Sequence, residues 1–292
     1  MKKDVDKRGE ILLEALPYIK KFWNKIVVIK YGGSAMQDKM LEGQIIEDII
    51  LLKYVGMKPV IVHGGGAEIS QEMKKRNIIP QFINGLRVTD QETMEITEMV
   101  LTGKINNRLV AEINLHILEG MGNGVKGIGL SGEDAQLLTV KKHSSLDLGF
   151  VGEIEKVNPE ILFVLLEKNY IPVIATVGVD KEGTRYNINA DTVAGQIGIS
   201  LQAEKLIYLS DVDGIFKDFE DPTSLISSLP INQAKDLIKS GKIQEGMIPK
   251  VDSAIQALEG GVDKVHFLNG KRAHSVLLEL FTDSGIGTEI IH

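Results

Sequence analysis

The hydrophobic positions of the chain fall into short apolar runs that alternate with stretches of helical spacing. The run over 26–30 precedes a helical pattern over 41–54, and the run over 59–63 precedes one over 67–76. A buried strand is a nearly continuous apolar run, whereas a surface helix repeats its apolar residues every three or four positions. Strand–helix–strand order implies parallel pairing, so the pattern predicts an α/β fold.

The same rhythm continues to the end of the chain. Further strands are predicted over 171–177, 205–210, 264–269 and 289–291, and further helices over 91–102, 106–118, 159–168, from 191, 232–240 and 249–258. The glycine-rich stretch 125–158 alternates as hairpins do, at the edge of the sheet or over its top. These elements predict a three-layer α/β/α sandwich with a mainly parallel central sheet.

An amphipathic helix is predicted over 8–24, before the first strand. Pro17 lies inside it and should kink it. Such a helix either caps the core of its own domain or packs on another subunit. The pattern alone leaves both interpretations open.

The bulk properties limit the classes of function. The chain has 292 residues, so one large domain and two lobes are both possible. Without cysteine it has no disulfide, thiolate nucleophile or thiolate metal site. A net charge of −7 gives no general attraction to nucleic acid, and no apolar run approaches the roughly 20 residues that span a bilayer. The charged start lacks the apolar core of a signal peptide, which indicates a cytoplasmic protein.

Glycines cluster where the first two predicted strands end. A lysine, Lys30, ends the first strand. The glycines after these two strands are Gly32, Gly33, Gly64, Gly65 and Gly66. Without Cβ atoms a backbone can approach a phosphate closely, and N–H groups at a helix start attract anions. Either loop alone also fits a tight turn, but the two together with Lys30 favour a phosphate site.

Three charged residues are candidates for chemistry, although each has an ordinary interpretation. Asp191 could act in catalysis or simply cap the helix that follows it. Lys250 at a helix start and Arg87 after a glycine could both be solvated surface groups, although a guanidinium suits a carboxylate ligand.

Two motif matches are misleading. Gly127, Gly129 and Gly132 fit the spacing GxGxxG, but 133–140 is predicted to be a strand, whereas a dinucleotide site needs a helix there. The string HGGG resembles a hydrolase oxyanion loop, but the chain has no GxSxG and no GxxxxGK[ST]. The sequence therefore does not predict a Rossmann site, a hydrolase site or a P-loop site.

Eight segments together resemble the acetylglutamate kinases of the amino acid kinase family. They are KYGGSAM from Lys30, VHGGG from Val62, GLRVTD from Gly85, GLSGED from Gly129, NINADTVAG from Asn187, LSDVDGI from Leu209, GMIPKV from Gly246 and FTDSGIGTEI from Phe281. Ala67, Glu133 and Asp213 depart from the commonest residues of that family. The resemblance implies ATP with Mg²⁺ and N-acetyl-L-glutamate as substrates, with no metal held by the protein alone.

The resemblance also implies a role for each matching residue. Lys30 and Lys250 would stabilise the transferring phosphoryl group, and Asp191 would position them. Gly65, Gly66, Arg87 and Asn187 would bind the acid, and the phosphate and nucleotide contacts would come from Gly32, Gly33, Gly64, Ser210, Asp211 and Gly214. Residues 25–190 would form the lobe that binds the acid, and 191–292 the lobe that binds ATP.

The N-terminal helix gains a meaning from the same resemblance. Family members inhibited by arginine carry a kinked helix that joins dimers into a hexamer, so 1–24 would serve oligomerisation as a trimer of dimers. The expected arginine site uses Tyr18, Lys217, His274 and Glu279. A PII-type regulatory protein is a further expected partner. The alternatives are a kinase for acetylaminoadipate or aspartate, and a catalytically silent subunit that binds nucleotide or arginine.

Overall fold

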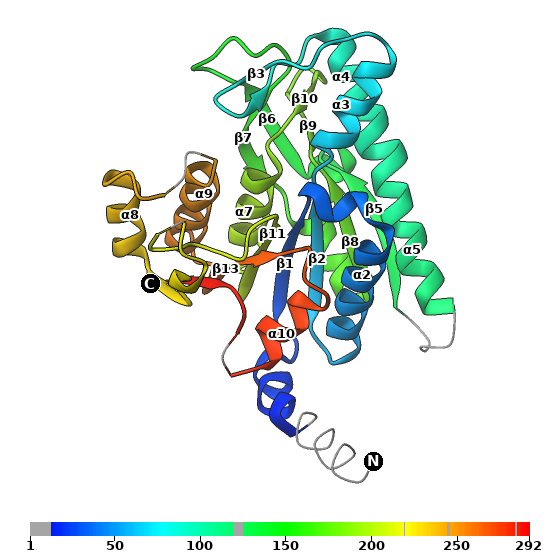
Figure 1. Ribbon diagram of the computed structural model, residues 1–292. Helices are drawn as coiled ribbons and strands as arrows, with labels where there is room; N and C mark the ends of the chain where they lie inside the picture. Colours follow the sequence, from blue (N-terminus) through cyan, green and yellow to red (C-terminus); the bar gives the residue numbers. More distant parts are fainter. Residues whose placement is uncertain (1–12, 119–124, 219, 244–245, 284) are drawn as a thin grey trace.

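The computed structural model describes residues 13–118, 125–218, 220–243, 246–283 and 285–292. Its centre is an eight-stranded sheet in the order β12-β14-β13-β11-β1-β2-β8-β5 (Figure 1). The strands are β1 (Ile26–Tyr31), β2 (Lys58–His63), β5 (Lys126–Ser131), β8 (Tyr170–Ala175), β11 (Lys205–Ser210), β12 (Ser228–Pro230), β13 (Lys264–Asn269) and β14 (Thr288–Ile291). Neighbours pair in parallel except β13 and β14.

Helices cover both faces of this sheet, which confirms the predicted three-layer sandwich. They are α2 (Lys39–Tyr54), α3 (Gly66–Lys75), α4 (Gln91–Glu98), α5 (Asn107–Leu118), α6 (Glu160–Glu167), α7 (Ala190–Ser200), α8 (Ile231–Lys239), α9 (Ile248–Glu259) and α10 (Ser275–Phe281). Successive residues of β1 enter different cores: Val27 and Ile29 pack with α2 and α5, and Val28 packs with α6, α7 and α9. Both faces of the strand are apolar because both are covered.

The middle of the chain builds a second layer beyond the carboxyl ends of the main strands. Strands β6 (Leu138–Lys142), β7 (Gly152–Val157), β9 (Val177–Val179) and β10 (Arg185–Asn187) form a four-stranded sheet, and β3 (Phe82–Ile83) and β4 (Leu86–Arg87) form a short hairpin. Two predictions need correction here. The strand expected over 133–140 begins only at Leu138, after a short 3₁₀ turn, and the run 171–177 divides between β8 and β9.

The two helices predicted over 91–118 are one continuous helical rod. Between α4 and α5 the chain keeps turning through a π-helical segment, Met99–Asn106. A π-segment adds a residue to the turn and is frequent at functional sites. It shifts the residues after it around the helix relative to those before it.

The N-terminal helix is described from residue 13, and it continues through Pro17 to residue 22; positions 8–12 of the predicted helix lie outside the described residues. Phe22 is buried in the core of its own chain. Leu13 and Leu16 on the same helix are exposed. The helix therefore caps the core and also presents apolar side chains outward.

We expect the two lobes to divide at residue 190. In the sheet this division corresponds to the boundary between β1 and β11, which lie side by side. Strands before it lie on one side of that junction and strands after it on the other. The two-lobe division stays a prediction. Among the described residues, no helix has the length and apolar character needed to cross a membrane.

Candidate active site

The first two glycine loops meet because β1 and β2 are parallel neighbours. Lys30 pairs in register with Val62, so both strands end at the same edge of the sheet. The Gly64 N–H donates to the carbonyl of Tyr31, at 3.0 Å, which links the two loops directly. Gly33 has φ of +81°, a conformation that glycine adopts without strain.

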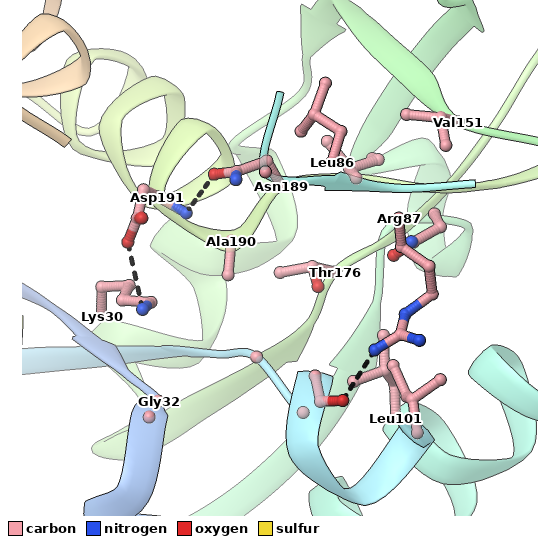
Figure 2. A pocket seen from close by; sticks show the side chains of 18 of the residues that line it. Lys30, Gly32, Leu86, Arg87, Leu101, Val151, Thr176, Asn189, Ala190 and Asp191 are labelled. Carbon is pink, nitrogen blue, oxygen red and sulfur yellow. Dashed lines mark hydrogen bonds and ion pairs between the residues drawn. The ribbon is translucent and has the colours of Figure 1, made fainter. Parts of the chain in front are cut away.

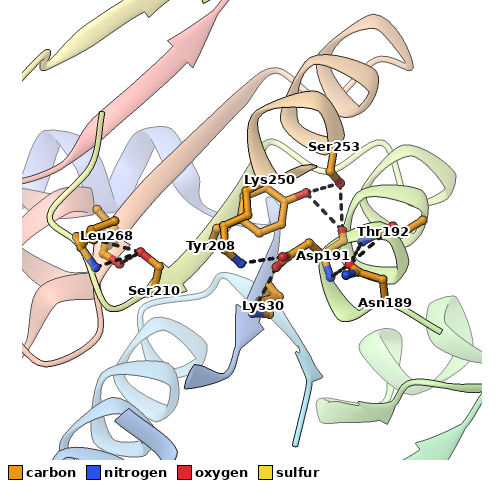
Figure 3. Close-up of polar contacts among 10 residues, drawn as sticks. Lys30, Asn189, Asp191, Thr192, Tyr208, Ser210, Lys250, Ser253 and Leu268 are labelled. Carbon is orange, nitrogen blue, oxygen red and sulfur yellow. Dashed lines mark hydrogen bonds and ion pairs between the residues drawn. The ribbon is translucent and has the colours of Figure 1, made fainter. Parts of the chain in front are cut away.

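Asp191 joins two lysines that are 220 positions apart in the sequence (Figure 3). Its Oδ1 lies 3.1 Å from Lys30 Nζ, and its Oδ2 accepts from Lys250 Nζ at 2.6 Å. Burial lowers the pKa of Lys30, and attraction to Asp191 only partly offsets this effect. Burial alone would raise the pKa of Asp191, but the two ammonium groups outweigh it and hold that pKa below its usual range. With both lysines protonated, the triad carries one net positive charge in a largely buried site.

The local fold leaves the Asp191 side chain free for this role. The cap of α7 is Asn189, whose Oδ1 accepts from the N–H groups of Asp191, at 2.9 Å, and Thr192, at 3.1 Å. The Asp191 carbonyl accepts from Tyr208 Oη and Ser253 Oγ, which anchor it to β11 and α9. The interpretation of Asp191 as a plain helix cap is thus wrong.

Lys30 and Asp191 line a cavity of about 210 Å³, whereas Lys250 is not among its lining residues (Figure 2). The predicted site residues that line it are Lys30, Gly32, Gly33, Gly64, Gly65, Gly66, Arg87, Asn187 and Asp191. Residues of the second layer also line the cavity, among them Phe82 and Leu86 of the β3–β4 hairpin and Val151 just before β7. The structure therefore brings together the predicted acid-binding residues, two catalytic candidates and both glycine loops.

Arg87 reaches into the cavity from β4. Its Nη2 donates to the carbonyl of Gly66 at 2.7 Å and to Ser70 Oγ at 2.8 Å. The guanidinium also stacks 4.7 Å from the ring centre of Phe82. These contacts fix the plane of a cation whose pKa is lowered by burial. A fixed, desolvated guanidinium is well suited to a carboxylate.

The nucleotide-side candidates divide into two groups. Asp211 faces the first glycine loop, because a Cβ on Gly33 would lie 3.1 Å from its Oδ1. Ser210 and Gly214 shape their own loop: Ser210 Oγ donates to the Val212 carbonyl, and a side chain at Gly214 would collide with Thr288. Beside them lies a small cavity lined by Val212, Gly214, Ile215, Phe216, Lys242, Ile243 and Met247.

The four arginine-site candidates each have different neighbours in the structure. Tyr18 donates to Asp283, and Glu279 on α10 accepts from His266, at 2.7 Å. His274 instead pairs with Asp48 of α2, at 2.7 Å. Lys217 lines a cavity between β12 and α8.

Several buried polar residues were missed by the sequence reasoning. Lys205 Nζ lies 2.8 Å from His266 Nε2 and 5.0 Å above the Phe22 ring, so it connects Glu279 to the N-terminal helix. His63 lies buried at the end of β2, beside the glycine loop. The available signals were a lysine as the first residue of an apolar strand and an imidazole as the last residue of another.

The GxGxxG match has a packing explanation. Gly127 and Gly129 lie inside β5, and side chains there would collide with Ile113 and Asn106 of the helix that covers the strand. The absence of a Cβ serves helix–sheet contact. These glycines do not open a helix, as a dinucleotide site would require.

Comparisons with known proteins agree with this geometry. A model of the amino acid kinase family matches residues 25–269. Acetylglutamate kinase of Caldanaerobacter subterraneus is 53% identical over 97% of this chain and 93% of its own length, and that of Aquifex aeolicus is 51% identical over 97% of each.

Solved structures give the same picture. N-acetylglutamate synthase of Neisseria gonorrhoeae, in complex with coenzyme A and N-acetyl-glutamate, aligns with a TM-score of 0.84 at 28% identity, over 97% of this chain and 63% of that one. A second structure of that synthase, with coenzyme A and L-arginine, has a TM-score of 0.82 at 27% identity and covers 97% of this chain and 65% of that one. Carbamate kinase of Giardia shares the fold, with a TM-score of 0.68 over 92% of this chain and 99% of that one, at 16% identity.

Proposed function

Because this chain belongs to the amino acid kinase family, we propose that it phosphorylates the γ-carboxylate of N-acetyl-L-glutamate with ATP, the second step of arginine biosynthesis. The relatives named above, about 50% identical over almost the whole chain, are acetylglutamate kinases. The observation that carries the proposal is the Lys30–Asp191–Lys250 triad at the edge of a cavity that also holds Arg87.

The site suits a carboxylate nucleophile. Such a group has a solution pKa of about 4.3, so it is already ionised at neutral pH and needs no general base. A carboxylate oxygen forms a bond to the γ-phosphorus of ATP while the bond from that phosphorus to the ADP oxygen breaks. Lys30 and Lys250 stabilise the charge on the transferring group, and Asp191 orients both lysines.

The acid is held at the opposite end of the cavity. Arg87 offers a planar cation to the α-carboxylate, and Asn187, whose Nδ2 lies 3.4 Å from Thr89 Oγ1, lines the same wall. The N–H groups at the start of α3 supply further donors, because the first four N–H groups of a helix have no partner within it. Residues 25–190 thus bind the acid in this proposal.

The nucleotide enters from the side formed by residues 191–292. We assign its base to the small cavity beside Gly214, and its phosphates to the path between Gly33 and Lys250. Mg²⁺ binds phosphates and waters together with one or two carboxylates. Asp211, which faces Gly33, fits such a contact, and the ion would add charge neutralisation to that of the lysines.

A hydroxamate-trapping assay with ATP and Mg²⁺ tests this proposal. We expect turnover with N-acetylglutamate, and a fall in kcat of about two to three orders of magnitude in Lys30→Ala, as when an oxyanion donor is lost. Wild-type kcat in that variant would refute the role of Lys30. Faster turnover with acetylaminoadipate or aspartate would identify a kinase for a related acid, and no turnover with any of them would identify a silent subunit.

We also propose feedback inhibition by L-arginine, bound between the N-terminal helix and α10. Burial opposes ionisation of Glu279, but hydrogen bonds from His266 and from the N–H groups of Ile286 and Gly287 hold its pKa at about 2. A carboxylate that stays ionised suits a guanidinium. The synthase that resembles this chain has been solved with L-arginine.

Assembly would accompany this regulation. The exposed apolar face of the N-terminal helix, with Leu13 and Leu16, is suited to pack on a second dimer and form a hexamer. Sedimentation should show hexamers, and millimolar arginine should inhibit the wild type but not Glu279→Gln. Dimers alone, or arginine-insensitive wild-type activity, would contradict the regulatory proposal. The PII-type partner stays a prediction from the resemblance.

A further inference from the structure

The side chain of His63 connects the π-helical segment to the glycine loop of the cavity. His63 is fully buried as the last residue of β2. Its Nδ1 lies 3.0 Å from the carbonyl oxygen of Gly64, and its Nε2 lies 3.1 Å from Nδ2 of Asn106. The mechanism described above uses neither His63 nor Asn106.

The surroundings of Asn106 decide which nitrogen of His63 carries the proton. The same Asn106 nitrogen lies 2.9 Å from the carbonyl oxygen of Val173 and 3.4 Å from that of Leu130. Two carbonyl oxygens require a donor, so this atom is the amide NH₂ group and not the amide oxygen. The two hydrogens of that group go to its nearer acceptors, the Val173 carbonyl and His63 Nε2. His63 Nδ1 carries the hydrogen that is donated to the Gly64 carbonyl, which can only accept.

A neutral imidazole fits this arrangement, because a protonated ring has no acceptor nitrogen. Burial lowers the pKa of His63 to about 4, although the hydrogen bond to Gly64 acts in the opposite direction. Arg108 adds a smaller lowering effect through its positive charge. His63 thus stays neutral at physiological pH as one defined tautomer.

This tautomer fixes the peptide between Gly64 and Gly65. The Gly64 N–H is held by Tyr31, and the Gly64 carbonyl is held by His63. In a planar trans peptide the N–H points opposite to the carbonyl. The Gly65 N–H is therefore directed away from His63, at the start of α3, where helix N–H groups lack intrahelical partners. Both glycines line the cavity.

The π-segment holds the same loop through packing. A Cβ on Gly65 would collide with the ends of Ile105 and Leu101, so these side chains pack directly against its Cα. Asn106 follows Ile105 in the chain. One short stretch of helix thereby contacts the loop through apolar side chains and, by way of His63, through a hydrogen bond.

We propose that His63 and Asn106 are positioning residues, which use a neutral Nδ1–H imidazole to aim the Gly65 N–H at an oxygen of the bound acid or of the phosphoryl group it receives. This inference rests on the proposed kinase reaction. It concerns groups that touch neither substrate and act only through the orientation of one peptide.

Two substitutions at His63 separate the two hydrogen bonds. An asparagine amide can replace Nδ1 and keep the donor to Gly64, whereas a glutamine amide can replace Nε2 and keep the contact with Asn106. Losing an oriented backbone donor costs up to 10²–10³ in rate, so we expect kcat/KM for the acid to fall about ten- to a hundredfold in His63→Gln but only about threefold in His63→Asn. The KM for ATP should stay within about twofold in both variants.

Asn106→Ala removes the contact with His63 Nε2 but leaves the imidazole able to donate to Gly64, so kcat/KM for the acid should fall about threefold, as in His63→Asn. Asn114→Ala is the matched control, because Asn114 also donates from α5 to a strand carbonyl, that of Gly127, and accepts from its N–H, away from the cavity. We expect Asn114→Ala to lose stability but to keep wild-type kcat/KM. Equal kinetic losses in His63→Gln and His63→Asn, or in the two alanine variants, would overturn the proposal.

The tautomer can be measured without any variant. A long-range ¹H–¹⁵N spectrum of the assigned wild-type protein should show His63 protonated at Nδ1 and unchanged between about pH 5.5 and 8. A proton on Nε2 would overturn the proposal even if the variants failed to fold. Failure of the kinase proposal is distinct, since the wild type itself would then show no turnover.

Discussion

Asp191→Asn is the most informative change in the site, because it removes one charge and little else. The amide has the shape of the carboxylate, but it leaves Lys30 and Lys250 without the anion that they share. The variant tests whether Asp191 acts by orienting and charging the two lysines. A role as general base would also be lost, but the two roles differ in their pH dependence.

The distances set the magnitude. At an effective dielectric constant of about 20, unit charges 3.1 Å apart attract by about 5 kcal/mol. Desolvation offsets much of this energy, and removing one partner from a buried ion pair costs roughly 3–5 kcal/mol. Lys30 can relieve the strain by losing its proton, so we expect the free energy of unfolding to fall by about 3 kcal/mol at pH 7.

The sign of the pH dependence follows from the lowered pKa of Asp191. A carboxyl group whose pKa is lower in the folded state stabilises the fold above its unfolded pKa, and this contribution is lost as the pH falls through the folded value. The difference in free energy of unfolding between wild type and variant should therefore be largest at neutral pH and should decrease at acid pH. Urea unfolding at several pH values measures it.

Catalysis should respond through Lys30. Burial already lowers the pKa of Lys30, and Asp191 opposes this effect. In Asp191→Asn the ammonium group loses its proton more readily, so we expect kcat to fall about 10²–10³-fold and the alkaline limb of the kcat profile to move to lower pH. A general base would instead leave the alkaline limb in place.

Glu204→Gln provides the control for charge removal, because Glu204 pairs with Lys25 at the surface, at 2.9 Å. Such a pair contributes about 0–1 kcal/mol, and we expect unchanged kinetics. Wild-type kcat with an unshifted pH profile in Asp191→Asn would refute the assignment of the triad.

Three further changes test other parts of the molecule. Arg87→Lys keeps the charge but loses the planar fork, so KM for the acid should rise about tenfold with little change in kcat, and an unchanged KM in steady-state assays would remove Arg87 from the acid site. Gly43→Ala places a methyl group in open space on α2. Urea titrations should show a free energy of unfolding that is higher by about 1 kcal/mol, and a lower free energy of unfolding would show that the site is not open. Burial raises the pKa of Asp48 to about 6, so its ionisation costs folding energy as the pH rises. The free energy of unfolding of Asp48→Asn should therefore rise relative to that of the wild type between about pH 4 and 6, by at most about 3 kcal/mol. A difference in the free energy of unfolding that does not change with pH would contradict this reasoning.

The main strands were predictable because both faces of the sheet are covered. Every residue of β11 is buried, and its bounds and those of β13 are the predicted ones, 205–210 and 264–269. The loops after β1 and β2 were also readable, since glycines there serve close backbone approach. The prediction was wrong for the run 171–177, which contributes to two sheets. The chain passes from β8 to β9 at Thr176, and the hydrophobic pattern shows no interruption there.

The support for the glycine loop was not readable from the sequence. His63 and Asn106 are 43 positions apart, and their contact depends on the π-segment, which changes the helical period by one residue within an otherwise regular pattern. Gly129 gave a partial signal, because a Cβ there would collide with Asn106. Only the observed packing of the π-segment on β5 turns that glycine into evidence for an asparagine at the contact.

The triad contains one residue, Lys250, whose local setting is unfavourable for its charge. Asp191 lies in the first turn of α7, where the helix dipole favours an anion, so its position has an ordinary explanation. Lys250 lies in the first turn of α9, which has no acidic residue and where the dipole disfavours a cation. Within the part of the chain that the structure describes, Asp191 of a different helix offsets this cost, and the anionic phosphates that the site is proposed to bind would offset it further. A basic residue at a helix start, read together with a lysine at a strand end, therefore predicts an anion site more strongly than an aspartate that suits its helix.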